Sequence, residues 1–212
     1  MITKKSNNVV VLAPHTDDGE FGCGGTIARL LENEFNVFYV AFSTAKESVP
    51  KGMPENILEI EVKEATKRLG IKPEHLIIFG FTVRKLNYYR QDILEELVKI
   101  KRELQPDLVF MPVIEDLHQD HHTVAMEGLR AFKQTSLLGY ELPWNNLTFH
   151  NQCFIKLEED HLKQKVFALD AYKSQKMRYY VSEDFVFSLA KTRGVMVNEK
   201  YAEAFEVIRW II

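Results

Sequence analysis

Two short polar clusters follow hydrophobic runs of the chain. Segment 15–18 (H-T-D-D) follows the run 9–14, and segment 118–121 (H-Q-D-H) follows the run 108–113. Open α/β sheets bind ligands at the carboxyl ends of their strands. Imidazole and carboxylate groups gathered there can hold a divalent metal ion and supply a general base. Together the two clusters predict a metal-dependent hydrolase.

The types of these residues suit a catalytic zinc site, which commonly has three protein ligands and one position left for water. We expect His15 and Asp18 to supply two ligands from the turn after the first strand, and His121 to supply the third. A parallel sheet brings distant strand ends together, so the separation in sequence is no obstacle. One zinc ion per chain is expected, although this ligand set also accepts Fe²⁺, Mn²⁺ or Co²⁺.

Hydrolysis also needs a base for the attacking water and a group that stabilises the developing oxyanion. Asp17 is adjacent to a ligand without being one, which suits the base. His118 suits a cationic partner for the oxyanion, and Asp120 would orient a catalytic histidine. Taken alone, Asp17 or Asp18 is more typical of a helix N-cap. Two clusters at two strand ends favour the metal site instead.

The elements that must position these side chains alternate between strand-like and helix-like segments. We expect strands over 9–13, 37–42, 76–79 and 108–113, and helices over 26–34, 55–69 and 91–104. This alternation predicts an α/β fold, a Rossmann-like three-layer αβα sandwich with a mostly parallel sheet. Beyond residue 122 we expect helices over 123–132, 162–172 and 184–191, strands over 149–156 and 204–212, and a loop over 138–146. Since no repeat or linker divides the chain, we expect a single domain over 1–212.

The composition excludes some classes of protein. The formal net charge of -3 over 212 residues gives no electrostatic reason to bind nucleic acid. No stretch approaches the ~20 apolar residues of a membrane span. The apolar run behind the charged start, residues 1–6, is too short for a signal peptide. We therefore expect a cytoplasmic protein without a transmembrane segment; the sequence leaves the oligomeric state open, a homo-oligomer included.

Both motifs resemble those of the PIG-L/LmbE superfamily of zinc-dependent N-acetyl-sugar deacetylases. The first family motif, commonly A-H-P-D-D-E followed by a G-x-G-G-T-like run, is similar to segments 14–20 and 22–26. The second, H-x-D-H, is similar to segment 118–121. The resemblance implies a Rossmann-like sheet and hydrolysis of the acetamide of an amino sugar, either free or linked to a lipid or a nucleotide. It also implies roles for the residues of both motifs. His15, Asp18 and His121 would bind zinc, and Asp17 would be the general base. His118 would stabilise the oxyanion, and Asp120 would tune His118.

The chain departs from the family pattern in places. Thr16 replaces the usual proline and Gly19 the usual acid, but neither is a proposed ligand or base. The helix after the second strand usually carries an arginine three residues before a glutamate. If Glu61 is that glutamate, Leu58 stands at the arginine position. Sugar recognition in this region is therefore expected to differ.

Candidate substrate contacts lie in the C-terminal half. Tyr140 or Trp144 could stack on a sugar face or anchor the loop that also holds Glu141. Arg193 would meet an anionic sugar or a nucleotide phosphate.

Three other interpretations remain open. Residues 120–122 spell the D-H-H signature of manganese phosphoesterases, but that class needs another aspartate at an intermediate strand end, and residues 42–46 contain no carboxylate. A non-catalytic metal- or sugar-binding module would keep the same residues. Finally, segment 22–26 could present backbone amides to a phosphate. It lacks the full dinucleotide spacing, so close backbone packing is the favoured explanation.

Overall fold

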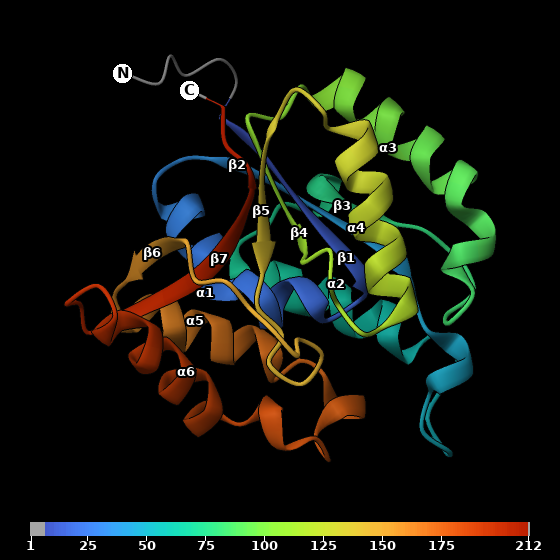
Figure 1. Cartoon of the computed structure of the whole chain (residues 1–212). Coiled ribbons are helices and arrows are strands. Elements are labelled where there is room, and N and C mark those ends of the chain that lie inside the picture. Colours follow the sequence, from blue (N-terminus) through green and yellow to red (C-terminus); the bar gives the residue numbers. More distant parts are fainter. Residues whose placement is uncertain (1–6, 212) are drawn as a thin grey trace.

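The computed structural model describes residues 7–211. Residues 1–6, the charged start, and Ile212, the end of the expected strand 204–212, lie outside the described residues. The described chain folds around one seven-stranded sheet with the order β3-β2-β1-β4-β5-β7-β6. All neighbouring strands pair in parallel except β7, which is antiparallel to both β5 and β6. The Rossmann-like, mostly parallel α/β sheet is therefore confirmed (Figure 1).

The strands are β1 (Asn8–His15), β2 (Asn36–Ser43), β3 (Leu76–Ile78), β4 (Leu108–Pro112), β5 (Ser136–Tyr140), β6 (Cys153–Leu157) and β7 (Tyr201–Arg209). The α-helices are α1 (Asp18–Glu32), α2 (Ile57–Leu69), α3 (Arg90–Leu104), α4 (Gln119–Ala131), α5 (Glu159–Leu169) and α6 (Glu183–Val195). Among them, no helix is both long and apolar enough to cross a membrane.

The side chains of the central strand β1 point alternately to the two faces of the sheet, and each face has its own apolar core. Val9, Val11 and Ala13 of β1 join one apolar cluster, whereas Val10 and Leu12 join the other. Successive side chains of a strand point to opposite faces of the sheet. Helices α1, α2, α5 and α6 cover the first face, and α3 and α4 cover the second (Figure 1). Because both faces are covered, the strand reads as an unbroken apolar run.

The structure differs from the expected elements at β5. Its residues 136–140 are all buried, whereas the sequence pattern predicts a loop from residue 138. Gly139, which favours a loop prediction, is needed here because an added Cβ would lie 2.9 Å from Val113. Tertiary packing therefore overrides the local turn signal.

Helix α1 also begins earlier than expected, at Asp18 rather than at residue 26. Glycines in its first half allow close packing, since a Cβ at Gly22 would lie 2.3 Å from the ring of Tyr140. The helix kinks at Cys23, where the backbone is non-helical. The favoured interpretation of the glycine-rich run, close backbone packing, agrees with this arrangement.

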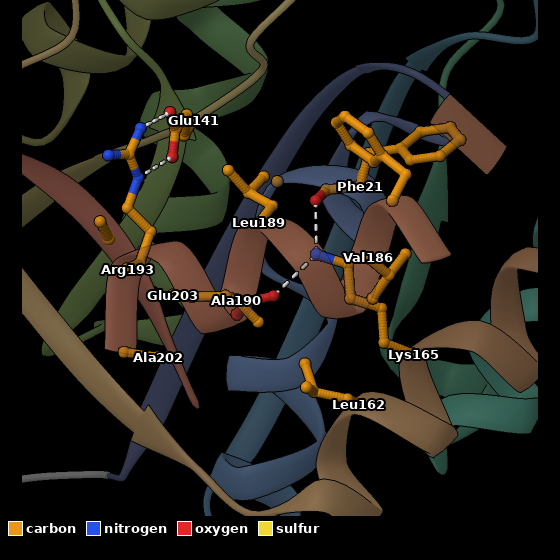
Figure 2. A pocket seen from close by; sticks show the side chains of 13 residues that line it. Phe21, Glu141, Leu162, Lys165, Val186, Leu189, Ala190, Arg193, Ala202 and Glu203 are labelled. Carbon is orange, nitrogen blue, oxygen red and sulfur yellow. Dashed lines mark hydrogen bonds and ion pairs between the residues drawn. The ribbon is translucent and has the colours of Figure 1, made fainter. Parts of the chain in front are cut away.

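A side chain of β7 satisfies the backbone amides that follow the kink. Gly25 and Thr26 donate from N to the Glu203 carboxylate, at 3.1 and 2.7 Å. Lys165 Nζ lies 2.7 Å from the same carboxylate and 2.6 Å from the carbonyl oxygen of Phe21 (Figure 2). These two amides are therefore engaged by the protein itself, unlike those of a phosphate-binding turn.

Candidate metal centre

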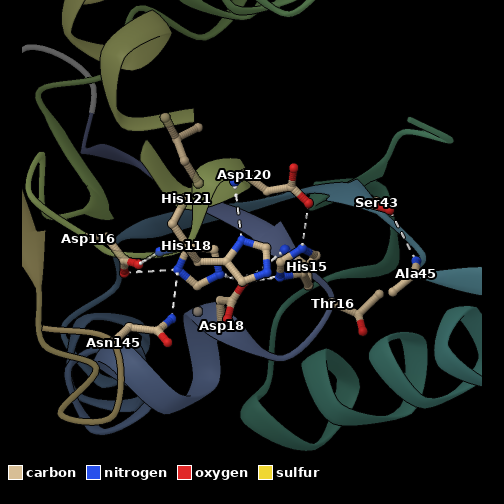
Figure 3. A network of polar contacts seen from close by, with 12 residues as sticks. His15, Thr16, Asp18, Ser43, Ala45, Asp116, His118, Asp120, His121 and Asn145 are labelled. Carbon is tan, nitrogen blue, oxygen red and sulfur yellow. Dashed lines mark hydrogen bonds and ion pairs between the residues drawn. The ribbon is translucent and has the colours of Figure 1, made fainter. Parts of the chain in front are cut away.

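Three donor atoms meet at the carboxyl ends of β1 and β4, where the order of the strands reverses. His15 ends β1, Asp18 begins α1, and His121 lies in the first turn of α4. The distances are 3.1 Å from His15 Nδ1 to Asp18 Oδ2, 3.2 Å from His121 Nε2 to Asp18 Oδ2, and 3.2 Å from His121 Nε2 to His15 Nδ1. The three groups point toward one another (Figure 3).

This triangle has the size of a metal site. A tetrahedral zinc ion ~2.0–2.1 Å from its nitrogen and oxygen ligands separates those atoms by roughly 3.4 Å. The observed spacings are slightly shorter, so small outward shifts of the side chains would suffice. His118 lies close by, and the ligand atoms of His15, His118 and His121 all lie within 4.8 Å of one another. The chain thus has a histidine-rich group that could hold a metal ion.

Carboxylates orient both histidines of the triangle. His15 donates from Nε2 to Asp120 Oδ2 at 3.1 Å, and His121 donates from Nδ1 to Asp116 Oδ2 at 2.9 Å. Since a carboxylate only accepts, each ring keeps its proton on the outer nitrogen. When a metal ion replaces the proton on the inner nitrogen, these outer contacts hold the remaining ring proton in place, which is the arrangement that metal-ligating histidines have in proteins.

The structure links Asp120 to a different histidine from the expected one. Its carboxylate contacts His15 and accepts from the backbone N–H groups of Arg84 and Leu86, at 2.5 and 3.1 Å. His118 receives only the backbone N–H of Asp120, on Nδ1 at 3.1 Å. Sequence reasoning missed Asp116, which lies two residues before His118 and also accepts its backbone N–H, at 2.8 Å. The sequence offers one signal for Asp116: it is a carboxylate in the loop after β4.

The bond to His118 also decides its protonation. A backbone N–H can only donate, so Nδ1 is unprotonated and the ring proton lies on Nε2. Burial and the neighbouring charges of His15 and His121 lower the pKa of His118 to about 4. Both observations favour a neutral His118 with its ring proton on Nε2, and its role as oxyanion partner stays a prediction.

Without a bound ion, protons take the place of a cation among these groups. Burial alone would lower the pKa of each ligand histidine. The charge of Asp18 and the hydrogen bonds to carboxylates nevertheless raise the pKa of His15 to about 9 and that of His121 to about 10. In return, the two histidines hold the pKa of Asp18 well below its usual range, despite its burial.

Asp17 lies beside the triangle without joining it. Burial and the charge of Asp18 raise the pKa of Asp17 to about 6. Both residues belong to a turn that buried tyrosines hold: Tyr39 and Tyr172 donate to the carbonyl oxygen of Thr16, at 2.9 and 2.7 Å. The tyrosine contacts position the acidic turn above the end of β1.

The triangle opens into a pocket that is continuous with solvent. Of the expected substrate contacts, Trp144 lines this pocket. Leu58 lines it too, the residue that stands at the arginine position if Glu61 is the glutamate of the family pattern. Two arginines that sequence reasoning missed, Arg84 and Arg178, also line it. No periodic pattern or motif marks either of them.

The other three expected contacts lie elsewhere. Tyr140 is fully buried, and its hydroxyl donates to the carbonyl oxygen of Leu12 at 2.9 Å. Arg193 pairs with Glu141, its Nε lying 2.9 Å from Glu141 Oε2, in a separate cavity beside α6 (Figure 2). Among the described residues, the lining of the histidine pocket includes none of these three.

Comparison with known proteins identifies the family. The family model described as PIG-L, GlcNAc-PI de-N-acetylase, matches residues 10–132, which is more than half of the chain. The chain belongs to the PIG-L family. The resemblance expected from the two motifs is thereby confirmed, and with it membership of a family of deacetylases.

Known proteins are similar to this chain over most of its length. It is 28% identical over 178 residues to the uncharacterized deacetylase YaiS of Escherichia coli K12, covering 80% of this chain and 92% of that protein. It is 26% identical over 224 residues to the diacetylchitobiose deacetylase of Thermococcus kodakarensis, covering 94% and 82%. The crystal structure of the conserved protein TT1542 from Thermus thermophilus superposes with a TM-score of 0.80 at 25% identity, covering 98% and 97%.

Proposed function

We propose that this protein removes the N-acetyl group from an amino sugar or sugar conjugate, with one zinc ion held by His15, Asp18 and His121. The observation that carries the proposal is the triangle of donor atoms whose two histidines are each oriented by a carboxylate. Membership of a deacetylase family supports the reaction class, and the diacetylchitobiose deacetylase among the relatives supports an N-acetylated sugar as substrate.

His15, Asp18 and His121 would hold the ion, and all three line the pocket that a substrate would enter. A divalent ion bound there polarises the acetamide carbonyl and makes water more acidic. Asp18 supplies the single anionic ligand, so the set combines nitrogen and oxygen donors in the ratio typical of catalytic zinc. Asp120 and Asp116 keep the rings of His15 and His121 in the orientation that binding requires.

Asp17 would carry the proton transfers, and His118 would stabilise the developing oxyanion. The Asp17 carboxylate accepts a proton from water as the water oxygen bonds to the acetamide carbon. His118 donates a hydrogen bond from Nε2 to the carbonyl oxygen while negative charge develops there. Protonated Asp17 then returns the proton to the sugar nitrogen as the carbon–nitrogen bond breaks. The products are acetate and a free amine.

Metal content and amine release test this proposal together. Wild-type protein, His121→Ala and His150→Ala are purified, their metal is quantified, and amine release is measured on a panel that includes N-acetylglucosamine and diacetylchitobiose. His150 is an exposed histidine outside the pocket and serves as the matched control. We expect about one zinc per chain and amine release in the wild type and the control, and the loss of both in His121→Ala.

Other outcomes point to the alternative functions. Stoichiometric metal without amine release from any acetamide would favour a binding module. Turnover of phosphodiesters with manganese, and none of acetamides, would favour a phosphoesterase. No metal in the wild type after supplementation would contradict the proposed centre itself.

A further inference from the structure

Two guanidinium groups lie on the wall of the histidine pocket without a carboxylate partner. Arg84 comes from the segment between β3 and α3, and Arg178 from the segment between α5 and α6. Among residues 7–211, no carboxylate lies within ion-pair distance of either group. Other arginines do have such partners, as Arg193 has in Glu141. Two unpaired cations in one pocket are a feature that the acetamide chemistry does not require.

One aromatic residue, Tyr180, contacts the exposed side chain of Arg178. Its Nη1 donates to the hydroxyl of Tyr180, and its guanidinium carbon lies 5.7 Å from the centre of that ring. Tyr180 in turn stacks on Trp144, with ring centres 3.8 Å apart and 10° between the planes. The ring of Phe21 is nearly perpendicular to both, with its centre 5.4 Å from that of Trp144 and 5.2 Å from that of Tyr180. A side chain held in this way loses little further freedom when it binds a ligand.

The backbone fixes the origin of the Arg84 side chain. Arg84 has a φ of 64°, in the left-handed region that residues with a Cβ adopt at a cost. Its N–H donates to Asp120 Oδ2 at 2.5 Å, and the same oxygen lies 3.1 Å from His15 Nε2. Arg84 is therefore tied to the carboxylate that orients a ligand histidine.

The charges of the pocket do not balance. Its lining contains two carboxylates, Asp17 and Asp18, but the second is shared between two histidines. The single charge of Asp17 remains to offset two arginines. Guanidinium groups bind carboxylate and phosphate groups with paired, charge-assisted hydrogen bonds.

We propose that Arg178 and Arg84 form a subsite for an anionic group, carboxylate or phosphate, which the amino-sugar substrate carries beyond its acetamide. This inference rests on the proposed function and specifies its substrate class. The stacked pair Trp144 and Tyr180 would form the wall along which the sugar reaches Arg178.

The test compares three acetamides that differ in charge. They are methyl N-acetylglucosaminide, which is neutral, N-acetylglucosamine 1-phosphate, which carries a phosphate, and N-acetylmuramic acid, which carries a carboxylate. The zinc-loaded wild type should have a higher kcat/KM for at least one anionic substrate than for the neutral one, and this preference should shrink as salt screens the charges. Arg178→Gln and Arg84→Gln should each lower the anionic-to-neutral ratio by about tenfold. Arg102→Gln, at the C-terminal end of α3 and outside the pocket, should leave the ratio unchanged.

Binding to the inactive variant Asp17→Asn separates this inference from the proposed function. If no acetamide releases amine, the proposed function fails, yet calorimetry still reports whether the phosphate or carboxylate probe binds more tightly than the neutral probe. If amine is released with the same ratio in both arginine variants as in the wild type, the subsite is overturned and the deacetylase stands. An equal fall in kcat on all three substrates would place Arg178 beside Asp17 in the reaction, and would also overturn the subsite.

Discussion

Asp120 Oδ2 lies 3.1 Å from His15 Nε2, on the side of the imidazole ring away from the nitrogen that faces Asp18. The same carboxylate accepts the backbone N–H groups of Arg84 and Leu86, so it cannot turn away from the ring without losing both bonds. Asp120, which lies outside the donor triangle, thus fixes the direction in which Nδ1 of His15 points.

Removing this carboxylate charge should weaken metal binding. We expect Asp120→Asn to lower the affinity for zinc by about 10–100-fold, because the second ligand shell orients the first. Competition with a chelator of known affinity measures this change. Asp92→Asn, in the first turn of α3 and outside the pocket, is the matched control. Equal zinc affinity in Asp120→Asn and the control would contradict the role of Asp120 in orienting His15.

Removing the base should separate binding from turnover. We expect Asp17→Asn to keep about one zinc per chain and to lose amine release by roughly 10²–10⁴-fold, the usual contribution of a general base. Metal analysis and steady-state kinetics on one preparation measure both quantities. Full activity in this variant would show that another group accepts the proton.

His118 should act on the transition state. Since its Nε2–H is placed to donate, we expect His118→Ala to lower kcat by about 10²–10³-fold while the KM changes little. The zinc content should stay near that of the wild type. A loss of zinc together with activity would instead assign His118 to the ligands, in line with its place in the histidine group.

The metal-free protein should lose stability in alkaline solution. The pKa values of His15 and His121, about 9 and about 10, lie above the unfolded value of ~6.5. Both histidines therefore contribute stability that is complete below pH ~6.5 and is lost as the pH rises through about 9 to 10. Thermal unfolding of chelator-treated protein at pH 6 and pH 9 measures the fall. In His121→Gln the fall should be smaller, and an equal fall in both proteins would contradict this account.

Packing beneath helix α1 should tolerate no added methyl group. A Cβ at Gly22 would lie 2.3 Å from the buried ring of Tyr140, so we expect Gly22→Ala to lower the free energy of unfolding by about 1–3 kcal/mol. Gly80→Ala, where a Cβ meets nothing within 4 Å, is the control. Denaturant titration of both variants gives the comparison, and equal stability would mean that the Tyr140 ring moves aside without cost.

Much of the fold could be predicted because its first half is regular. Each parallel strand of that half is an apolar run followed by an amphipathic helix, so the order of elements is visible in local periodicity. The strand β5 was missed since its burial comes from neighbours on both sides rather than from alternation. Likewise the start of α1 was placed too late, because glycines that end helices elsewhere are here required by the packing around Tyr140.

The candidate site could be predicted where a residue type that binds metals stands near the end of a predicted strand. His15, Asp18 and His121 stand at strand ends, and their distances agree with the expected ligand set. Asp116 is marked only by its place in the loop after β4, and Arg178 by nothing, since the importance of both depends on which side chains the fold brings beside them. The family pattern marks Leu58 as a departure, but nothing in the sequence indicates that an arginine far along the chain lines the same pocket.

The contacts of Glu203 with the amides of Gly25 and Thr26 have a consequence for synthesis of the chain. All the residues proposed for metal binding and proton transfer lie within the first 121 positions, yet backbone amides of the helix that carries Asp18 are bound from β7, which is made after them. Lys165 and Tyr172, which also hold this region, are made late as well. A nascent chain stalled after α4 would therefore hold every ligand without the contacts that position them. Loading of the metal should therefore wait until β7 has been made and has packed against α1.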